Sequence, residues 1–449
     1  MTTSKQQIQA EPATSRLDLK ETEVGSVFVS NYPPYSFWRE DQKPEALRVL
    51  QTPPASENTL GLYLHIPFCR KRCKFCYFRV YTDKNSAQVE EYVDALAREV
   101  EIYSGRPAVQ NRPLKFVYFG GGTPSFISVK HLKELAKRTQ AAISWDGAEE
   151  VTFECEPGTL SQSKLEAIRE IGVTRLSLGI ENFDDFVLRE NGRAHLSKEV
   201  YDVQPWIEAL NFDQLNIDLI AGMVGETWAT WKDNVSKTID YDPDSVTIYQ
   251  MELPFNTVYT QLLSEDGGAV HVADWPTKRD WHQYAFEEME RAGYTLSSAY
   301  TMVKQGKQCH FVYRDAVWQG TDMLGTGVAS FGHMSGVHMQ NSASWNDYLT
   351  ALQSGELPLK RAFVASEEEQ LVREMILQLK LGRIRTGYFI SKFGVEITEK
   401  FSQAFQRLVD EGMLTFDAEE VRLTVRGLLR VDQLLPEFYS EVYRNSRYT

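Results

Sequence analysis

The feature that most constrains the fold of this chain is a regular alternation between short apolar runs and longer amphipathic stretches. Each apolar run has the length of a strand and reads as nearly continuous hydrophobic sequence, which is typical of a strand buried on both faces. The runs are Leu62–Phe68, Phe116–Phe119, Val151–Cys155, Arg175–Ile180, Leu215–Ile220 and Val246–Met251. Helical periodicity fills the stretches Val89–Tyr103, Val129–Ile143, Gln162–Ile171, Lys198–Leu210 and Trp228–Ile239.

Strands that alternate with helices predict an α/β fold with a parallel sheet, either a partial TIM-like barrel or a doubly wound sheet. Ligands bind such sheets at the carboxyl ends of the strands. Polar residues or glycines stand at four of these ends, namely Gly120–Thr123, Glu154, Glu181 and Asp218. A single acidic residue there could merely cap the next helix, but four such ends together favour a ligand site.

The rest of the chain divides by its sequence character. We predict a mobile tail over 1–25, an aromatic and proline-rich strap over 26–60, the sheet core over 61–260, a less regular accessory extension over 261–365 and a C-terminal domain over 366–449. The prolines at the centre of the strap, in Tyr32–Trp38, disfavour regular structure. In the last part, helical patterns precede a hairpin pattern at Met413–Thr424, which is typical of a winged-helix-like unit.

Composition narrows the class of protein. The 449 residues are 42% hydrophobic and 24% charged, which is ordinary for a soluble protein. No apolar run has the length of a membrane span, and the N-terminus has no apolar signal segment. A net charge of −14 argues against a large nucleic-acid interface. Five cysteines, an odd number in a long chain, indicate a reduced and therefore cytoplasmic protein.

Three of these cysteines, Cys69, Cys73 and Cys76, fall in one Cys-x3-Cys-x2-Cys motif. Three thiolates on one loop can ligate three irons of a 4Fe–4S cluster and leave the fourth iron open. An open iron can bind S-adenosylmethionine (SAM), and one electron then splits SAM into methionine and a 5′-deoxyadenosyl radical. A structural zinc site is the alternative, and it needs a fourth ligand such as His65.

Basic residues surround the motif: Arg70, Lys71, Arg72 and Lys74. They could receive an acidic electron donor such as a flavodoxin, or they could form an ordinary solvated loop.

The cysteine motif and several later segments resemble the oxygen-independent coproporphyrinogen III oxidase (HemN-like) family of radical SAM enzymes. The similar segments are Tyr63–Cys76, Phe119–Ser125, Arg175–Asn182, Gly192–His195, Asn216–Gly222, Leu324–Phe331 and Gln340–Asn341. The resemblance implies a six-stranded partial (β/α)6 barrel with an accessory C-terminal domain. It also implies a 4Fe–4S cluster held by the three motif cysteines, and one or two SAM molecules.

The resemblance further implies a set of SAM-binding positions. They are Tyr63, Gly121, Gly122, Thr123, Glu154, Glu181, Arg193 and Asp218. The glycines would let the backbone approach the methionine moiety, and Arg193 suits a carboxylate because its guanidinium binds one bidentately. Glu181 departs from the family, which has glutamine at this position.

A second departure concerns the substrate, because Phe78 stands where the oxidase has a fourth nearby cysteine. The resemblance implies an oxidoreductase of porphyrin biosynthesis that decarboxylates a coproporphyrinogen-like tetrapyrrole. Two alternatives stay open at this point. One is a class C radical SAM methyltransferase or cyclopropanase that uses two SAM molecules, and the other is a haem chaperone-like, haem-binding protein. For all three we expect a small-molecule ligand and neither a membrane nor a nucleic acid as partner.

Overall fold

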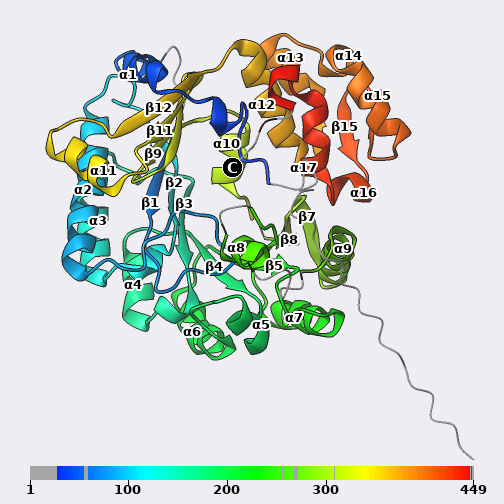
Figure 1. Ribbon diagram of the computed structural model, residues 1–449, viewed down its shortest axis with the longest axis horizontal. Helices are drawn as coiled ribbons and strands as arrows, with labels where there is room; N and C mark the ends of the chain where they lie inside the picture. The colour runs from blue at the N-terminus through cyan, green and yellow to red at the C-terminus, as the bar shows by residue number, and fades with distance from the viewer. Residues whose placement is uncertain are drawn as a thin grey trace, which may run out of the picture.

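The computed structural model describes residues 28–54, 59–254, 257–265, 272–307, 309–444 and 446. Its main body is built on a twelve-stranded sheet with the strand order β12-β11-β10-β9-β1-β2-β3-β4-β5-β6-β8-β7. A C-terminal domain lies beside one end of this sheet (Figure 1). The predicted tail, residues 1–25, lies outside the described residues. No helix in the described ranges combines the length and apolarity that crossing a membrane requires.

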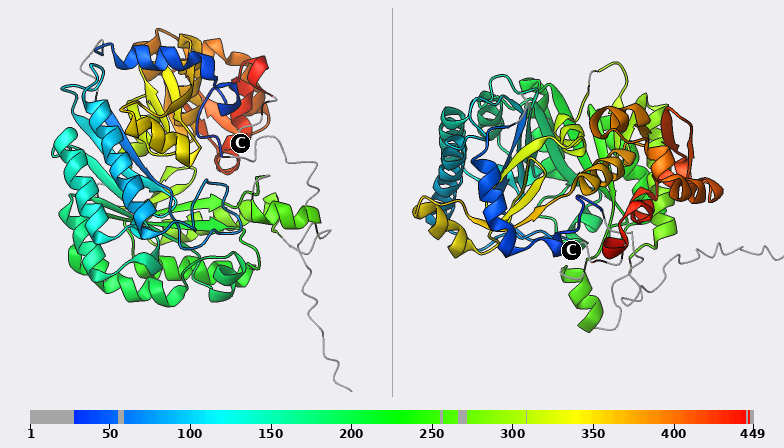
Figure 2. Two further views of the ribbon diagram at one scale, coloured as in Figure 1. Left: turned by 60° about the vertical axis from the view of Figure 1, so that its left-hand side comes forward. Right: turned by 90° about the horizontal axis from the view of Figure 1, so that it is seen from above.

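The centre of the sheet is the predicted parallel unit. Six consecutive strands lie side by side in chain order, with all neighbouring pairs parallel. They are β1 Leu60–Ile66, β2 Leu114–Gly121, β3 Glu150–Cys155, β4 Arg175–Glu181, β5 Gln214–Ala221 and β6 Ser245–Gln250. Helices connect them and cover the outer face of the sheet (Figures 1 and 2): α2 Ser86–Ser104, α3 Val129–Ala142, α4 Gln162–Glu170, α5 Asp185–Glu190, α6 Ser197–Leu210 and α7 Trp228–Tyr241.

The sheet has more strands than the six that were predicted, because short strands extend it at both edges. Beside β1, strand β9 (Asp322–Thr326) is parallel, and β10 (Phe331–Met334), β11 (Val337–Asn341) and β12 (Leu359–Val364) follow as antiparallel strands. Beside β6 lie the antiparallel β8 (Thr301–Lys304) and β7 (Tyr294–Ser298). These strands have only four to six residues and mixed polarity, so sequence periodicity does not reveal them.

The described residues within 261–365 are therefore more regular than predicted. Besides these strands, helices occur in and next to this range: α8 Val258–Glu265, α9 Trp275–Arg291, α10 Val312–Trp318 and α11 Trp345–Gln353.

The N-terminal strap contains more regular structure than its prolines led us to expect. It includes the short 3-10 helices η1 (Tyr35–Phe37) and η2 (Glu40–Gln42) and the helix α1 (Lys43–Leu50). Proline in the first turn of α1 is tolerated because that turn has no N–H partner to lose. The aromatic rings of the strap pack on other parts of the chain: Trp38 stacks on His338 with 5.2 Å between ring centroids, and Tyr32 lies 5.0 Å from Tyr439. The strap thus joins a sheet edge to the C-terminal domain.

The C-terminal domain has its own apolar core, which also includes strap residues. Its first helices are α12 Glu367–Leu379, α13 Thr386–Phe393, α14 Ile397–Lys400 and α15 Ser402–Asp410. The predicted hairpin is present as β14 Leu414–Phe416 and β15 Glu420–Leu423, and β13 Arg383–Arg385 adds a third antiparallel strand. The chain then forms α16 Val425–Leu428, α17 Val431–Leu434, η5 Leu435–Phe438 and α18 Glu441–Arg444.

Candidate functional site

A cavity of about 430 Å³ lies at the carboxyl ends of the parallel strands, where the sequence predicts a ligand site. We call the side formed by the cysteine loop and the strand ends the near wall. Its residues include Cys69, Cys73, Cys76, Gly121, Gly122, Thr123, Glu154, Glu181, Arg193 and Asp218. A second group of lining residues, which we call the far wall, includes Phe28, Tyr249, Glu252, Tyr300, Leu428 and Asp432.

The cysteine loop follows β1 directly and is closed by backbone hydrogen bonds at its base. Tyr81 N–H donates to Pro67 O over 2.8 Å, and Cys69 N–H donates to Tyr81 O over 3.1 Å. Within the loop, Cys76 N–H donates to Cys73 O over 3.1 Å. These bonds hold a tight turn in which all three thiols border the cavity.

The three thiols fit a cluster better than a single ion. Among the described residues, no three Cys, His, Asp or Glu side chains converge as one metal ion would require. A structural zinc needs four such ligands around one point, whereas the thiols of a cubane cluster bind different irons. Burial raises the pKa of the Cys69 thiol and raises that of Cys76 to about 12. A thiol with a raised pKa loses its proton only when a positive charge stabilises the thiolate. The iron of a cluster would provide that charge.

The predicted fourth zinc ligand, His65, faces away from this role. Its ring packs against Gly121, where an added Cβ would lie 2.7 Å from the imidazole. Burial lowers the pKa of His65 to about 4, so the ring is neutral.

The glycine loop after β2 lies against the cysteine loop. Gly121 has a φ of 121°, a conformation that favours glycine. A Cβ on Gly122 would approach Phe68 O to 2.9 Å and Cys69 Sγ to 3.0 Å, so only glycine fits. Thr123 Oγ1–H donates to Cys69 Sγ over 3.4 Å just before the short helix η3 (Pro124–Phe126). Backbone and hydroxyl groups thus stand next to the first cysteine.

Three acidic side chains border the cavity at successive strand ends. Tyr118 O–H donates to Glu154 Oε1 over 2.6 Å and Gly121 N–H to Glu154 Oε2 over 3.1 Å. Asp218 accepts hydrogen bonds of 2.9 Å from Ser177 and from Asn216. Burial raises the pKa of Glu154 and of Glu181 to about 7, and it also raises that of Asp218. Glu154 and Glu181 can therefore hold protons near neutral pH.

Arg193 links the acidic strand ends to the cysteine loop. Its Nη2–H donates to Gly179 O over 2.6 Å, and its Nη1–H donates to Cys73 Sγ over 3.4 Å. The same Nη1 lies 3.6 Å from Glu181 Oε1. Glu181 has a φ of 66° and follows an irregularity in the β4–β5 register, which turns its side chain to Arg193. A hydrogen bond to a thiolate sulfur stabilises the charged form of the ligand.

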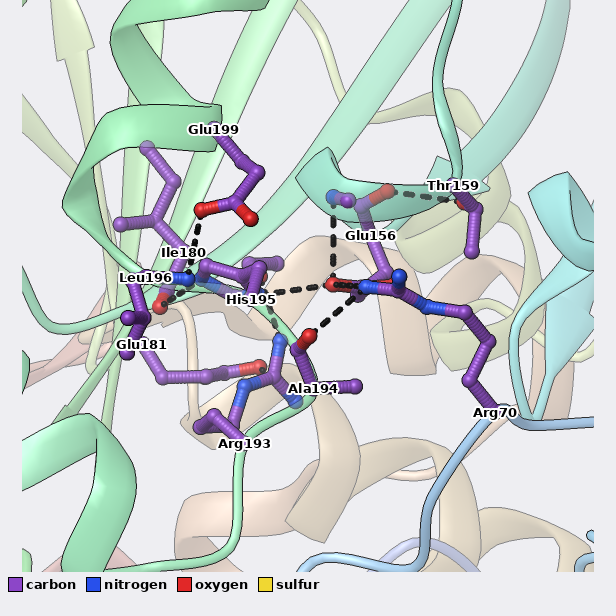
Figure 3. Close-up of polar contacts among 12 residues, drawn as sticks. Arg70, Glu156, Thr159, Ile180, Glu181, Arg193, Ala194, His195, Leu196 and Glu199 are labelled. Atoms are coloured by element: carbon purple, nitrogen blue, oxygen red, sulfur yellow. Dashed lines mark hydrogen bonds and ion pairs between the residues drawn. The ribbon is translucent and has the colours of Figure 1, made fainter.

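A further charged group next to the cysteine loop centres on Glu156, which sequence reasoning missed (Figure 3). His195 Nδ1 lies 2.9 Å from Glu156 Oε1, and Arg70 Nη2 lies 3.1 Å from the same oxygen. Arg70 Nη2–H also donates to Ala194 O over 2.8 Å. Glu156 follows β3 in Glu154-Cys-Glu156, so the signal was a second acidic residue at the same strand end.

Tyr63 is the predicted position that does not border the cavity among the described residues. Its ring is stacked on Tyr118, with centroids 5.7 Å apart and an interplanar angle of 12°. The hydroxyl lies 3.4 Å from His65 Nδ1 and fills the space where a Cβ on Gly120 would come within 2.9 Å. Contact between Tyr63 and SAM therefore stays a prediction.

The far wall is held by two carboxylates, Glu252 and Asp432. Phe28 N–H donates to Glu252 Oε1 over 2.6 Å, and Val29 N–H donates to Asp432 Oδ1 over 2.9 Å. Lys380 Nζ, fully buried, lies 2.8 Å from Asp432 Oδ1. Burial, with Asp432 nearby, raises the pKa of Glu252 to about 8.

Aromatic rings cover much of the remaining far wall. Tyr249 and Tyr300 stack with centroids 6.0 Å apart, and Phe28 lies 5.2 Å from Tyr300. No sequence pattern indicated that Tyr300 and Asp432 would meet at this wall.

Two family models match this chain. The first, described as the Radical SAM superfamily, matches residues 63–237, and the second, the HemN C-terminal domain, matches residues 365–430.

Full-length relatives carry two different names. The heme chaperone HemW of Bacillus subtilis is 26% identical over 385 residues, which are 85% of this chain and 99% of the relative. The oxygen-independent coproporphyrinogen III oxidase of Pseudomonas aeruginosa is 26% identical over 424 residues, 90% of either chain. Among solved structures, the coproporphyrinogen III oxidase HemN of Escherichia coli matches with a TM-score of 0.80 and 21% identity. That match covers 92% of this chain and 96% of HemN.

Proposed function

We propose, from the premise that the chain carries a radical SAM domain and a HemN C-terminal domain, that it is a radical SAM oxidoreductase acting on a tetrapyrrole. The observation that carries the proposal is one cavity with two chemically different walls. The near wall offers three thiols and the polar groups expected for SAM. The far wall offers stacked aromatic rings, which suit the pyrrole rings of a tetrapyrrole.

When bound, a 4Fe–4S cluster and SAM would supply a carbon radical that abstracts hydrogen. The chain's own residues would bind and position these groups. Cys69, Cys73 and Cys76 would ligate the cluster, and Arg193 would stabilise the Cys73 thiolate through its N–H···S bond. Glu154 and Glu181 can accept or donate protons at the polar atoms of SAM, since their raised pKa values allow both states near neutral pH, and Asp218 borders the same space.

The reaction we infer is the oxidative loss of CO2 from a propionate side chain. A hydrogen atom leaves the β-carbon, CO2 leaves the neighbouring carbon, and one electron passes to an acceptor, so that a vinyl group remains. The far wall would keep water away from the radical, because its aromatic rings and the backbone of Phe28 close that side.

We also propose where the reducing electron enters. Arg70, Lys71, Arg72 and Arg79 are exposed around the cysteine loop, and this basic surface would attract an acidic donor such as a flavodoxin. Raising the ionic strength should then slow reduction by a flavodoxin but not reduction by dithionite.

The finer points of the fold belong to the same proposal. Strands β1–β6 would act as a partial barrel around the cavity, supported by their unbroken order and by the strand ends that border it. Residues 61–260, 261–365 and 366–449 would be the core, its accessory extension and the HemN-like domain. The free cysteines of the described residues agree with a cytoplasmic location.

A second candidate function is haem binding without turnover, as in a haem chaperone. The observation that favours it is the B. subtilis heme chaperone HemW, which this chain matches over 99% of that relative's length. The same aromatic wall would then bind the haem face. The third candidate function is that of a class C methyltransferase, which needs two SAM molecules at one site.

The test is anaerobic incubation of the reduced, cluster-loaded protein with SAM, coproporphyrinogen III and an electron acceptor. We expect 5′-deoxyadenosine and a tetrapyrrole that has lost CO2, both measured by mass spectrometry. Tight haem binding without product would favour the chaperone. S-adenosylhomocysteine with a methylated or cyclopropanated product would favour the methyltransferase.

A further inference from the structure

Arg175 is a buried cation on the cavity wall whose charge is unpaired within the described residues. It begins β4, is 1% exposed and borders the cavity. Its Nε and Nη1 have no hydrogen-bond partner, and no ion pair joins it to a carboxylate of the described chain. The guanidinium carbon lies 4.0 Å from the centroid of the Phe311 ring, which holds the group in place from one side.

The carboxylates near Arg175 are engaged elsewhere. Glu150 accepts hydrogen bonds from the backbone N–H groups of Val312 (2.9 Å) and Tyr313 (3.2 Å). Glu154 and Asp218 bind the tyrosine, serine and asparagine partners described above. Burial raises the pKa of all three carboxyl groups, although the positive charge of Arg175 opposes the shift, and none of the three forms an ion pair with the guanidinium.

A buried guanidinium with unused hydrogen-bond donors destabilises the folded protein unless an anion accepts hydrogen bonds from those donors. The planar fork of arginine matches a carboxylate, which it binds through two parallel N–H···O bonds. The SAM carboxylate already has a candidate partner in Arg193, which lies against Cys73. Arg175 therefore remains for a second anion in the same cavity.

We propose that Arg175 binds a carboxylate of the substrate and so selects for acidic over esterified or neutral ligands. The proposal rests on the proposed function, since it assigns this cavity to the substrate. Tyr118, Phe311 and Tyr249 border the same space, so the preferred ligand is a carboxylate attached to an aromatic or conjugated body.

The experiment separates the carboxylate from the rest of the ligand. Cluster-loaded protein is titrated with coproporphyrin III and with its tetramethyl ester, and binding is followed by porphyrin fluorescence. Arg175→Met and Arg175→Lys are compared with Arg314→Met. Arg314 is a suitable control because it is also buried beside Phe311, at 5.7 Å, but it pairs with Asp315 at 2.8 Å and does not border the cavity.

We expect the wild type to bind the free acid more tightly than the ester. Arg175→Met should reduce this preference by about 10- to 100-fold, because a charge-assisted hydrogen-bond pair is lost. Arg175→Lys should retain part of the preference, and Arg314→Met should retain all of it.

Three results would overturn the proposal. One is an unchanged acid-to-ester ratio in Arg175→Met, and another is an equal loss for acid and ester, which would mark a purely structural role. The third is a matching loss of SAM affinity, which would assign the guanidinium to SAM. A wild type that prefers the acid but releases no CO2 would instead refute the proposed reaction and leave the role of Arg175 standing. Failure of the wild type to bind either porphyrin would overturn the role of Arg175, whereas the proposed reaction is tested separately by the assay with coproporphyrinogen III.

Discussion

On the near wall of the cavity, the functional groups stand at the ends of successive parallel strands, whereas on the far wall they come from unrelated parts of the chain. The Asp432–Val29 hydrogen bond joins residues 403 positions apart, and the Glu252–Phe28 bond spans 224 positions. The near wall is therefore a property of the sheet itself. The far wall exists only when strap, sheet and C-terminal domain are docked.

This difference teaches that the two walls should fail in different ways. A change on the near wall should affect cofactor chemistry while the fold survives, since the strands are held by their own ladders. A change on the far wall should loosen the docking of domains before it affects the cysteine loop. The following predictions test this contrast, from the largest expected effect to the smallest.

Replacing Cys73 by alanine should abolish 5′-deoxyadenosine formation and lower the iron content of anaerobically prepared protein. Two thiols cannot hold a cluster that needs three protein ligands. Cys309→Ala is the matched control, because Cys309 is buried and does not border the cavity. Full activity in Cys73→Ala would show that the cluster site lies elsewhere.

Replacing Asp432 by alanine should lower the free energy of unfolding by about 3–5 kcal/mol, because Lys380 keeps a buried charge without its partner. Urea unfolding measures the change, and the exposed Asp410→Ala serves as control. Iron content at low urea should stay at the wild-type level. A lower iron content in this variant, with an unchanged free energy of unfolding, would contradict the proposed difference between the two walls.

Replacing Arg193 by lysine should reduce the rate of SAM cleavage by about 10- to 100-fold, the usual effect of losing a group that supports a metal ligand. Lysine keeps the charge but cannot bond Gly179 O and Cys73 Sγ together. Arg189→Lys, on an exposed ion pair with Asp185, should leave the rate unchanged. The unfolding free energy should differ little between the two variants, and a large loss in Arg193→Lys would contradict a role confined to the near wall.

Replacing Glu252 by glutamine should change how stability depends on pH. The pKa of Glu252 is raised to about 8 in the folded state, so the folded protein holds more protons than the unfolded chain between about pH 4.3 and 8. Stability from this group therefore falls as pH rises through that window. The glutamine variant lacks this fall, so its Tm relative to wild type should rise from pH 5 to pH 8.5. A constant difference would mean that Glu252 titrates normally.

The parts that could be predicted from the sequence share one property: their geometry follows from local pattern. The apolar runs predict strands β1–β6. Because these strands are parallel, the same pattern predicts that Glu154, Glu181 and Asp218 lie together at the carboxyl ends of the strands. Short strands outside β1–β6 escaped prediction because a strand such as β10 or β13 has too few residues to display a period. The contacts of Asp432 and Lys380 could not be predicted, because a helical pattern does not indicate which distant backbone group a side chain will contact.

The bond between Val29 and Asp432 also has a consequence for biosynthesis. As the chain leaves the ribosome, the cysteine loop and all six parallel strands emerge well before residue 432. Until that residue arrives, the far wall lacks Asp432 and the hydrogen bond that ties Val29 to the C-terminal domain. The contact between the strap and the C-terminal domain therefore forms only after the cysteine loop has been synthesised.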